Sequence, residues 1–289
     1  MLVALVWLAA AGAASAAESA RPTVLVEDLI LGTRKMMMSF DVGEVLKIIE
    51  IAPDGQSMRV HLTIDVEVSA VVFRYRRHTD IHAWYDARGL RMFVSEIDDD
   101  GKITSLSGVR KTIVREREMV HVYGVVEGRE VNQVVPVSYF HFTSLENYAY
   151  LTALTRVKGT WRVLDLFTGD IWIVHVTPTG MTPCPEPAEG QCYRVELKSP
   201  KNSGVFYYTL EGLLAGAEGE DSLGVFTMRE REEDEQPIAL PAEEGGGFLK
   251  GLFDGASLGP DAAPASEPAL PPPAVAPEPE TPPRTGVAP

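Results

Sequence analysis

The stretch MRVHLTIDVEVS, residues 58–69, decides the fold class because its side chains alternate strictly in polarity. Its even positions are apolar: Met58, Val60, Leu62, Ile64, Val66 and Val68. Successive side chains of a β-strand point to opposite faces, so this period of two predicts a strand with one buried face. The turn sequence PDGQ at residues 53–56 and the apolar run at residues 45–51 precede it, and together they predict a hairpin.

The alternation changes phase at residues 70–72, since Phe73 and Tyr75 put apolar side chains at odd positions. A slip of one residue in a continuous strand would turn every later side chain to the other face. We therefore expect a bulge or sharp bend here, as in the long bent strands of a strongly curved sheet or half-barrel.

Short strands separated by turn signals continue along the chain. Turns are expected at 86–89, 98–101, 116–118 and 127–128, and strands at 90–94, 102–104, 111–115, 119–126, 161–166, 171–176, 192–197, 205–210 and 223–229. One helix is expected at about residues 145–156. The predicted fold is mainly β: a strongly curved antiparallel sheet, or an open or half β-barrel, with one short helix.

Composition divides the chain of 289 residues, whose formal net charge is −15, into three segments. Residues 1–20 combine an apolar run with Ala14-Ser15-Ala16, the small-x-small pattern of signal peptidase sites, although their start has no Lys or Arg. We expect a cleaved signal peptide there; a buried N-terminal helix is the alternative. Residues 235–289 are rich in Pro, Ala, Glu and Gly, which predicts a disordered acidic tail. Residues 21–234 remain as one β domain.

The two cysteines of the chain, Cys184 and Cys192, bracket a short polar loop. In an oxidising compartment such a pair forms a disulfide; two free thiols are the alternative. No apolar stretch after the signal peptide is long enough for a transmembrane helix, so we expect a periplasmic or secreted protein without a membrane span.

The expected tail contains one apolar interruption, GGGFLKGLFDG. Phe248, Leu249, Leu252 and Phe253 have helical spacing there and could dock an envelope protein or a membrane surface. An incidental apolar patch in a linker is the alternative interpretation.

A dense polar cluster, RYRRHTDIHAWYDARG, occupies residues 74–89. Strand geometry puts one set of its side chains on a single face: Arg74, Arg76, His78, Asp80 and His82. His78 and His82 would lie about 13 Å apart along a strand, too far to share one ion. We therefore interpret this face as solvated, with cross-strand ion pairs, and expect no metal site.

Motifs of several reaction classes are missing from the sequence. It contains no G-x-S-x-G nucleophile motif, no phosphate-binding glycine loop, and no basic stripe for nucleic acid. The adjacent acids at 98–100 fit a turn better than a calcium loop. We expect a non-catalytic protein without a cofactor and without a nucleic-acid partner; a hydrolase with a carboxylate pair is a lower-ranked alternative.

Residues 136–154 form the most aromatic stretch of the chain. An apolar molecule or lipid could bind to such side chains, because ligand sites are largely apolar with a few polar groups. The alternative is that they fill the concave face of the sheet as ordinary core. The candidate pocket residues are Tyr139, Phe140, Phe142, Tyr148 and Tyr150, with Trp84 from the polar cluster.

Four short segments resemble a known family: LGTR at 31–34, HAWYDARGL at 82–90, VPVSYF at 135–140 and DLFTG at 165–169. Together they resemble an uncharacterised family of exported bacterial β-proteins of unknown function. The chain departs from the family pattern where Ala87-Arg88 separate Asp86 from Gly89, and where Phe140 stands in place of Trp. The resemblance implies an exported curved sheet, similar to the half-barrels of periplasmic lipoprotein carriers, and implies no catalytic residues.

These observations favour an exported, non-catalytic envelope protein that binds an apolar ligand or lipid on the concave face of its sheet. A protein-interaction module that acts through the C-terminal tail is the alternative.

Overall fold

The computed structural model describes residues 21–35, 38–70, 73–113, 117–221 and 224–232. The first half of this region contains eight strands: β1 (Thr23–Lys35), β2 (Met38–Ile51), β3 (Ser57–Ala70), β4 (Phe73–Asp86), β5 (Gly89–Asp99), β6 (Lys102–Ile113), β7 (Arg117–Val126) and β8 (Arg129–Pro136). A short 3-10 helix, Val137–Tyr139, and strand β9 (Phe142–Thr143) lead to helix α2 (Tyr148–Thr155). Six strands follow: β10 (Gly159–Leu164), β11 (Ile171–Pro183), β12 (Gln191–Lys198), β13 (Asn202–Tyr208), β14 (Leu214–Asp221) and β15 (Gly224–Glu230).

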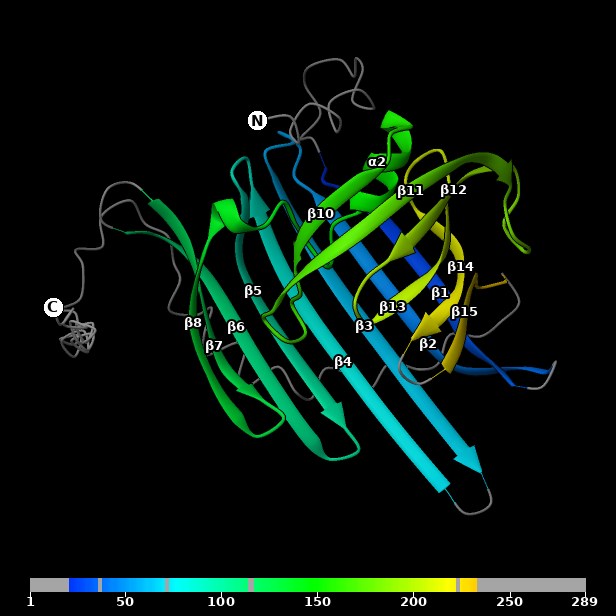
Figure 1. The fold of residues 1–289 in the computed structure, drawn as a ribbon, viewed down its shortest axis with the longest axis horizontal. Helices are drawn as coiled ribbons and strands as arrows, with labels where there is room; N and C mark the ends of the chain where they lie inside the picture. Colours follow the sequence, from blue (N-terminus) through cyan, green and yellow to red (C-terminus); the bar gives the residue numbers. More distant parts are fainter. Residues whose placement is uncertain (1–20, 36–37, 71–72, 114–116, 222–223, 233–289) are drawn as a thin grey trace, which may run out of the picture. The chain divides into compact units, whose positions relative to one another are not determined.

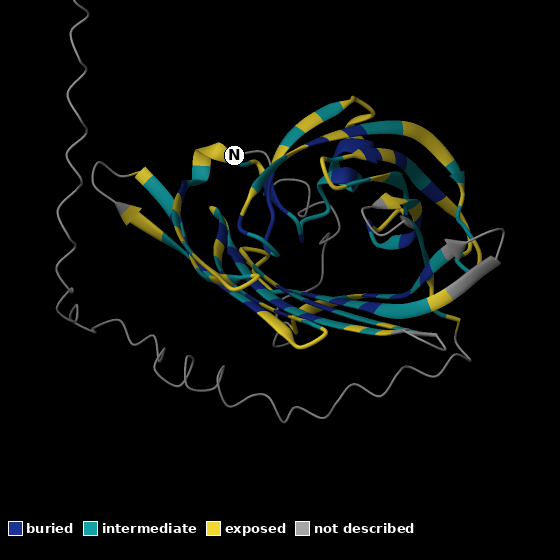
Figure 2. Ribbon diagram, turned by 60° about the horizontal axis from the view of Figure 1, so that its bottom comes forward, coloured by how far each residue is buried: buried dark blue, intermediate teal, exposed yellow. Residues whose placement is uncertain are grey.

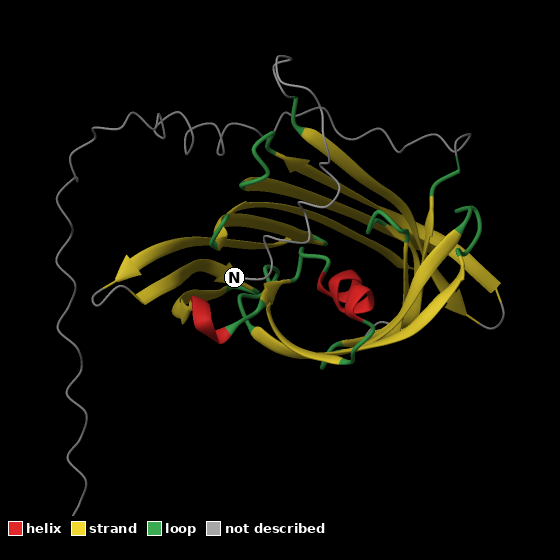
Figure 3. Ribbon diagram, turned by 90° about the horizontal axis from the view of Figure 1, so that it is seen from above, coloured by secondary structure: helices red, strands yellow, loops and turns green. Residues whose placement is uncertain are grey.

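All fifteen strands of the described region belong to one sheet, in the order β8 to β1 and then β15 to β9 (Figure 1). Within each run, strands that follow one another in the sequence are neighbours in the sheet, and the two runs join where β1 pairs with β15. Every pairing is antiparallel except that of β9 with β10. The sheet curls strongly without closing, so that β8 and β9 are its two edges (Figure 3). The predicted class, a curved and mainly antiparallel sheet with one helix, is confirmed.

The concave face of the sheet holds the main core, and helix α2 lies on this side (Figure 3). On β3 the buried apolar residues are at even positions, such as Val60 and Leu62, and on β4 at odd positions, such as Ile81 and Ala83. A second core cluster forms where Ala149 and Ala153 of α2 pack against β11 and β12. Buried and more exposed residues alternate along these strands, as the period of two requires (Figure 2).

The expected bent strand is wrong, because β3 ends at Ala70 and β4 begins at Phe73 in the opposite direction. Strands β3 and β4 pair antiparallel from Ala70 with Phe73 to Ser57 with Asp86. In that register each residue pairs with one of opposite parity, so even positions of β3 share a face with odd positions of β4. The phase change therefore marks a hairpin, and the curvature arises from the whole sheet.

Several segments of the structure differ from those predicted from the sequence, and others are not described by it. Helix α2 begins at Tyr148, three residues later than predicted, and β1, β8, β9 and β14 were not predicted. The expected signal peptide, the tail, and the docking residues Phe248, Leu249, Leu252 and Phe253 lie outside the described residues. Among the helices that the structure describes, none has the length and apolar character needed to cross a membrane.

Candidate functional site

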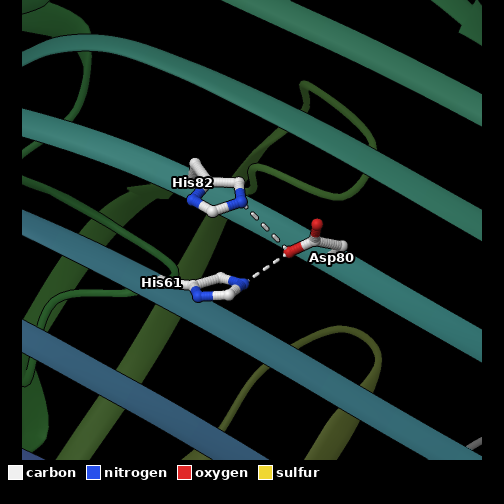
Figure 4. Close-up of side chains that lie close together, drawn as sticks. All are labelled: His61, Asp80 and His82. Atoms are coloured by element: carbon white, nitrogen blue, oxygen red, sulfur yellow. Dashed lines mark hydrogen bonds and ion pairs between the residues drawn. The ribbon is translucent and has the colours of Figure 1, made fainter. Parts of the chain in front are cut away.

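The convex face of the β3–β4 hairpin brings two histidines and an aspartate together (Figure 4). His61 of β3 pairs directly with His82 of β4, and Thr63 pairs with Asp80. Side chains of directly paired residues on one face lie within contact distance, so the register alone places these groups side by side. We call His61, Asp80 and His82 the His–Asp–His cluster.

Asp80 is the centre of this cluster. Its Oδ1 atom lies 2.7 Å from His61 Nε2 and 3.4 Å from His82 Nε2. Partial burial tends to raise the pKa of the Asp80 carboxyl, but the hydrogen bonds and positive charge of the two imidazoles hold this pKa well below its usual range. Asp80 is therefore a carboxylate that accepts hydrogen bonds from both rings.

The two imidazoles are stacked, with centroids 4.0 Å apart and ring planes 16° apart. Trp84 continues the stack at 5.9 Å from His82, and the Arg59 guanidinium lies 5.7 Å from the Trp84 ring centroid. A shallow pocket of about 70 Å³ adjoins the cluster, lined by Ile48, Glu50, Arg59 and His61. Such a volume admits an ion and a few waters, far less than the roughly 300 Å³ of a small-molecule site.

The sequence placed only part of this cluster. His78, considered there as a partner of His82, instead lies 2.7 Å from Asp65 on the same face. His61 lies on β3, opposite His82 of β4, so spacing along a single strand does not reveal it. Within the described residues, this is the one group of three or more His, Cys, Asp and Glu side chains whose ligand atoms all lie within 4.8 Å of one another.

The aromatic pocket candidates separate into four places. Phe142, Tyr148 and Tyr150 gather around α2 on the concave side, whereas Phe140 packs against the main core. Tyr139 is 56% exposed, and Trp84 lies on the convex face beside His82. Only part of the predicted set therefore comes together.

Further rings, unnoticed in the sequence, complete the group around α2. Trp161 packs edge-on against Phe142 with centroids 5.3 Å apart, and its Nε1 donates a hydrogen bond to Thr152 Oγ1 of the helix. Tyr150 contacts Tyr193 and Tyr208 with centroids 5.8 and 6.1 Å away. We call this group the aromatic cluster: Phe142, Tyr148, Tyr150, Trp161, Tyr193 and Tyr208. Its members come from β9, α2, β10, β12 and β13, which no local pattern could reveal.

Polar contacts fix the loop before α2 to the concave face. Lys47 lies 3.4 Å from Glu27 Oε2, and its Nζ donates a hydrogen bond of 2.7 Å to Asn147 Oδ1. The Glu27 carboxylate also accepts a hydrogen bond from the backbone N–H of Leu214. Glu27 and Lys47 are both buried, so their charges are compensated by each other and by hydrogen bonds.

Glu146 directly precedes Asn147, the residue that accepts the hydrogen bond from Lys47. Its Oε2 accepts a 2.7 Å hydrogen bond from the backbone N–H of Thr143. Burial raises the pKa of Glu146 to about 7, against the opposing effects of the Thr143 hydrogen bonds and the Lys47 charge. Thr143 in turn contacts the Tyr85 hydroxyl at 2.6 Å, which links the loop to β4.

Ser95 carries a second unusual polar group on this side of the sheet. Its residue is fully buried on β5 between Phe93 and Ile97 on the same face. Among the described residues, its Oγ atom has no hydrogen-bond partner. Buried hydroxyls normally have a partner, so an unpaired one is unusual.

The predicted disulfide is confirmed: Cys184 and Cys192 are joined, with Cα atoms 4.9 Å apart. It links the connection after β11 to β12, close to where Thr182 pairs with Cys192. Cys192 is fully buried.

Comparisons with known proteins agree with the fold and leave the activity open. Residues 41–231 match the family described as domain of unknown function DUF6134. No curated protein matches the sequence. The structure is similar to that of the beta-barrel-like protein of domain of unknown function DUF1849 from Brucella abortus, with a TM-score of 0.57 at 11% identity over 74% of this chain and 98% of that chain. This likeness shows the fold alone, and the expected resemblance to a β-family of unknown function is confirmed. The chain thus belongs to the DUF6134 family.

Proposed function

We propose that the protein is an exported, non-catalytic component of the cell envelope that binds an apolar molecule, such as a lipid, on the concave side of its sheet. The aromatic cluster around α2 is the observation that carries this proposal. Four of its rings, those of Tyr148, Tyr150, Trp161 and Tyr193, are only partly buried. Partly exposed rings bind an apolar partner by their faces and a polar head by their hydroxyl or N–H groups.

The way in which α2 covers the concave face supports the same function. The helix buries only small side chains, those of Ala149, Thr152 and Ala153. Small residues bury little apolar area, so these three side chains hold the helix less firmly than Leu or Phe would. The helix region is also held by the Trp161–Thr152 and Lys47–Asn147 hydrogen bonds and by the ring contacts of Tyr148 and Tyr150. A ligand that enters beside α2 would shift this helix and contact the rings beneath it.

The Ser95 hydroxyl fits a ligand with a polar head or an ester group. A buried hydroxyl without a partner costs about 1–3 kcal/mol, and a polar group of the ligand would recover part of that cost. An entirely hydrocarbon ligand would leave Ser95 unpaired, so we expect an amphiphile.

Export is supported by the disulfide, because such bonds persist in oxidising compartments. The expected signal peptide at residues 1–20 supports it as well. The titratable groups on the concave side, Glu27, Lys47 and Glu146, hold the loop before α2, which favours binding over catalysis.

Fluorescence of the apolar probe N-phenyl-1-naphthylamine tests this function. We expect the purified protein to bind the probe and a long-chain phospholipid to displace it. The substitution Tyr150→Ser should weaken probe binding by about fivefold or more, since it removes a large aromatic contact. The matched control is Tyr139→Ser, which alters an exposed ring outside the aromatic cluster. Equal probe affinity in both variants would contradict the proposed site.

A further inference from the structure

We propose that the His–Asp–His cluster binds a divalent transition-metal ion, Zn²⁺ or Cu²⁺, on the convex face of the sheet. This site is independent of the apolar site on the concave face. Two imidazole nitrogens and one carboxylate oxygen are donors that these ions accept in proteins.

All three donor residues lie on the paired strands β3 and β4, and none lies in a loop. His61 and His82 occupy directly paired positions. Asp80 lies on the same face, two residues before His82 on β4. All three ligand atoms lie within 4.8 Å of one another. Ligands on neighbouring central strands of a sheet have a fixed backbone, so only side-chain rotation is needed to bring them onto one ion.

Solvent reaches this group. The His61 and Asp80 side chains are each 32% exposed, and the His82 side chain is 12% exposed. The neighbouring pocket of about 70 Å³ leaves room beside His61 for further ligands such as water. Three protein donors with an open position are typical of sites where the metal exchanges or binds another molecule, whereas structural zinc sites are closed by four.

Binding requires the rings to turn. Imidazole nitrogens direct their lone pairs in the ring plane, and the two planes here are nearly parallel at a centroid distance of 4.0 Å. In the arrangement drawn in Figure 4, both Nε2 atoms point toward Asp80 Oδ1. An ion that replaces the two hydrogen bonds would draw the Nε2 atoms together and tilt the rings apart at their far edges.

Arg59 opposes the ion and so sets its affinity. Its Nη2 atom lies 3.4 Å from His82 Nδ1, the nitrogen that usually donates to an acceptor when the other nitrogen binds a metal. Its charge also repels a cation, and Glu50, at 3.8 Å, compensates it only partly. Removal of Arg59 should therefore strengthen metal binding. No such gain is expected if the three side chains only form hydrogen bonds with one another.

The simpler account is a hydrogen-bonded network in which Asp80 joins the two rings and never binds an ion. Titration of the tag-free full-length protein, stripped of metal, with Zn²⁺ by calorimetry distinguishes the two. We expect one Zn²⁺ to bind, and His61→Ala, His82→Ala and Asp80→Asn each to weaken binding by at least about 100-fold, because even substitutions of residues that only hold a metal ligand in place cost about 10- to 100-fold. His78→Ala is the matched control on the same face, since His78 pairs with Asp65, and should leave the affinity unchanged.

Two further measurements distinguish the loss of a metal ligand from a failure of the variants to fold. Arg59→Ala should bind Zn²⁺ several-fold more tightly than wild type, a gain that misfolding cannot produce. Imidazole resonances of His61 and His82 should shift on Zn²⁺ addition while those of His78 and His121 stay in place. No binding below millimolar Zn²⁺, or binding that survives all three ligand substitutions, would overturn the proposal in favour of the hydrogen-bonded network.

Discussion

Lys47 and Asn147 are one hundred residues apart in the sequence, yet Lys47 Nζ donates a 2.7 Å hydrogen bond to Asn147 Oδ1. This bond fixes the loop before α2 onto β2, beside the buried Glu27 carboxylate. It is one of the contacts by which the first run of strands holds the loop that leads into α2.

The substitution Lys47→Met should therefore destabilise the protein by about 3–5 kcal/mol, because it leaves the Glu27 charge buried without its counter-charge. Chemical denaturation at pH 7 measures this loss. The double variant Glu27→Leu/Lys47→Met should recover most of the stability, and the exposed control Lys102→Met should change it by less than about 0.5 kcal/mol. A double variant as unstable as the single one would show that the burial of Glu27 is not the cause.

Glu146 should make stability depend on pH. Its pKa of about 7 in the folded protein exceeds the ordinary value of 4.5, so the folded state holds the proton more tightly than the unfolded state. The protonated carboxyl makes its full contribution to the free energy of unfolding below about pH 4.5. That contribution is lost as the pH rises from there to about 7. The loss is up to about 3 kcal/mol.

Glu146→Gln should remove this dependence. Unfolding free energies of wild type and variant, measured from pH 4.5 to 8, should differ most above pH 7, with the variant the more stable. A constant difference across that range would contradict the raised pKa.

The fold could be predicted because its signal is local. Alternation such as that of residues 58–69 reports a half-buried strand directly, and PDGQ at residues 53–56 marks its hairpin. The hairpin at Ala70 and Phe73 was misread because a two-residue connection and a one-residue slip both invert the parity of the apolar positions. β14 was missed since its sequence, LAGAEGED, has almost no alternation.

The sites could be predicted only in part, because their residues meet across strands. His82 and Asp80 were recognised as ligand types, but His61 joins them only through the register of β3 and β4. That register was available in principle, since pairing Ala70 with Phe73 fixes His61 opposite His82. The meeting of Trp161 with Tyr148 and Tyr150 depends on where α2 docks, which no local pattern encodes.

Ser95→Ala should stabilise the ligand-free protein by about 1 kcal/mol, because it removes a buried hydroxyl without a partner and adds no volume. Thermal unfolding measures the change. Ser105→Ala, at a partly exposed position on neighbouring β6, is the control and should have little effect. Destabilisation by Ser95→Ala would mean that the hydroxyl has a partner, such as a bound water, in solution.

The disulfide should contribute measurable stability. Replacing both Cys184 and Cys192 by Ala should cost about 2–3 kcal/mol, since the cross-link closes a short loop in the unfolded chain. Denaturation of the wild type with and without reductant provides the comparison, and the double variant should be insensitive to reductant. Equal stability of all forms would show that the paired β11 and β12 already supply this constraint.

Native mass spectrometry of the protein isolated from the envelope of its host tests the central claim, apolar ligand binding on the concave side, most directly. The wild type should carry a non-covalent adduct that organic extraction identifies as an amphiphilic lipid, and the Tyr150→Ser variant should carry less of it than Tyr139→Ser. Bare protein in every preparation, or an adduct unaffected by Tyr150→Ser, would contradict the claim.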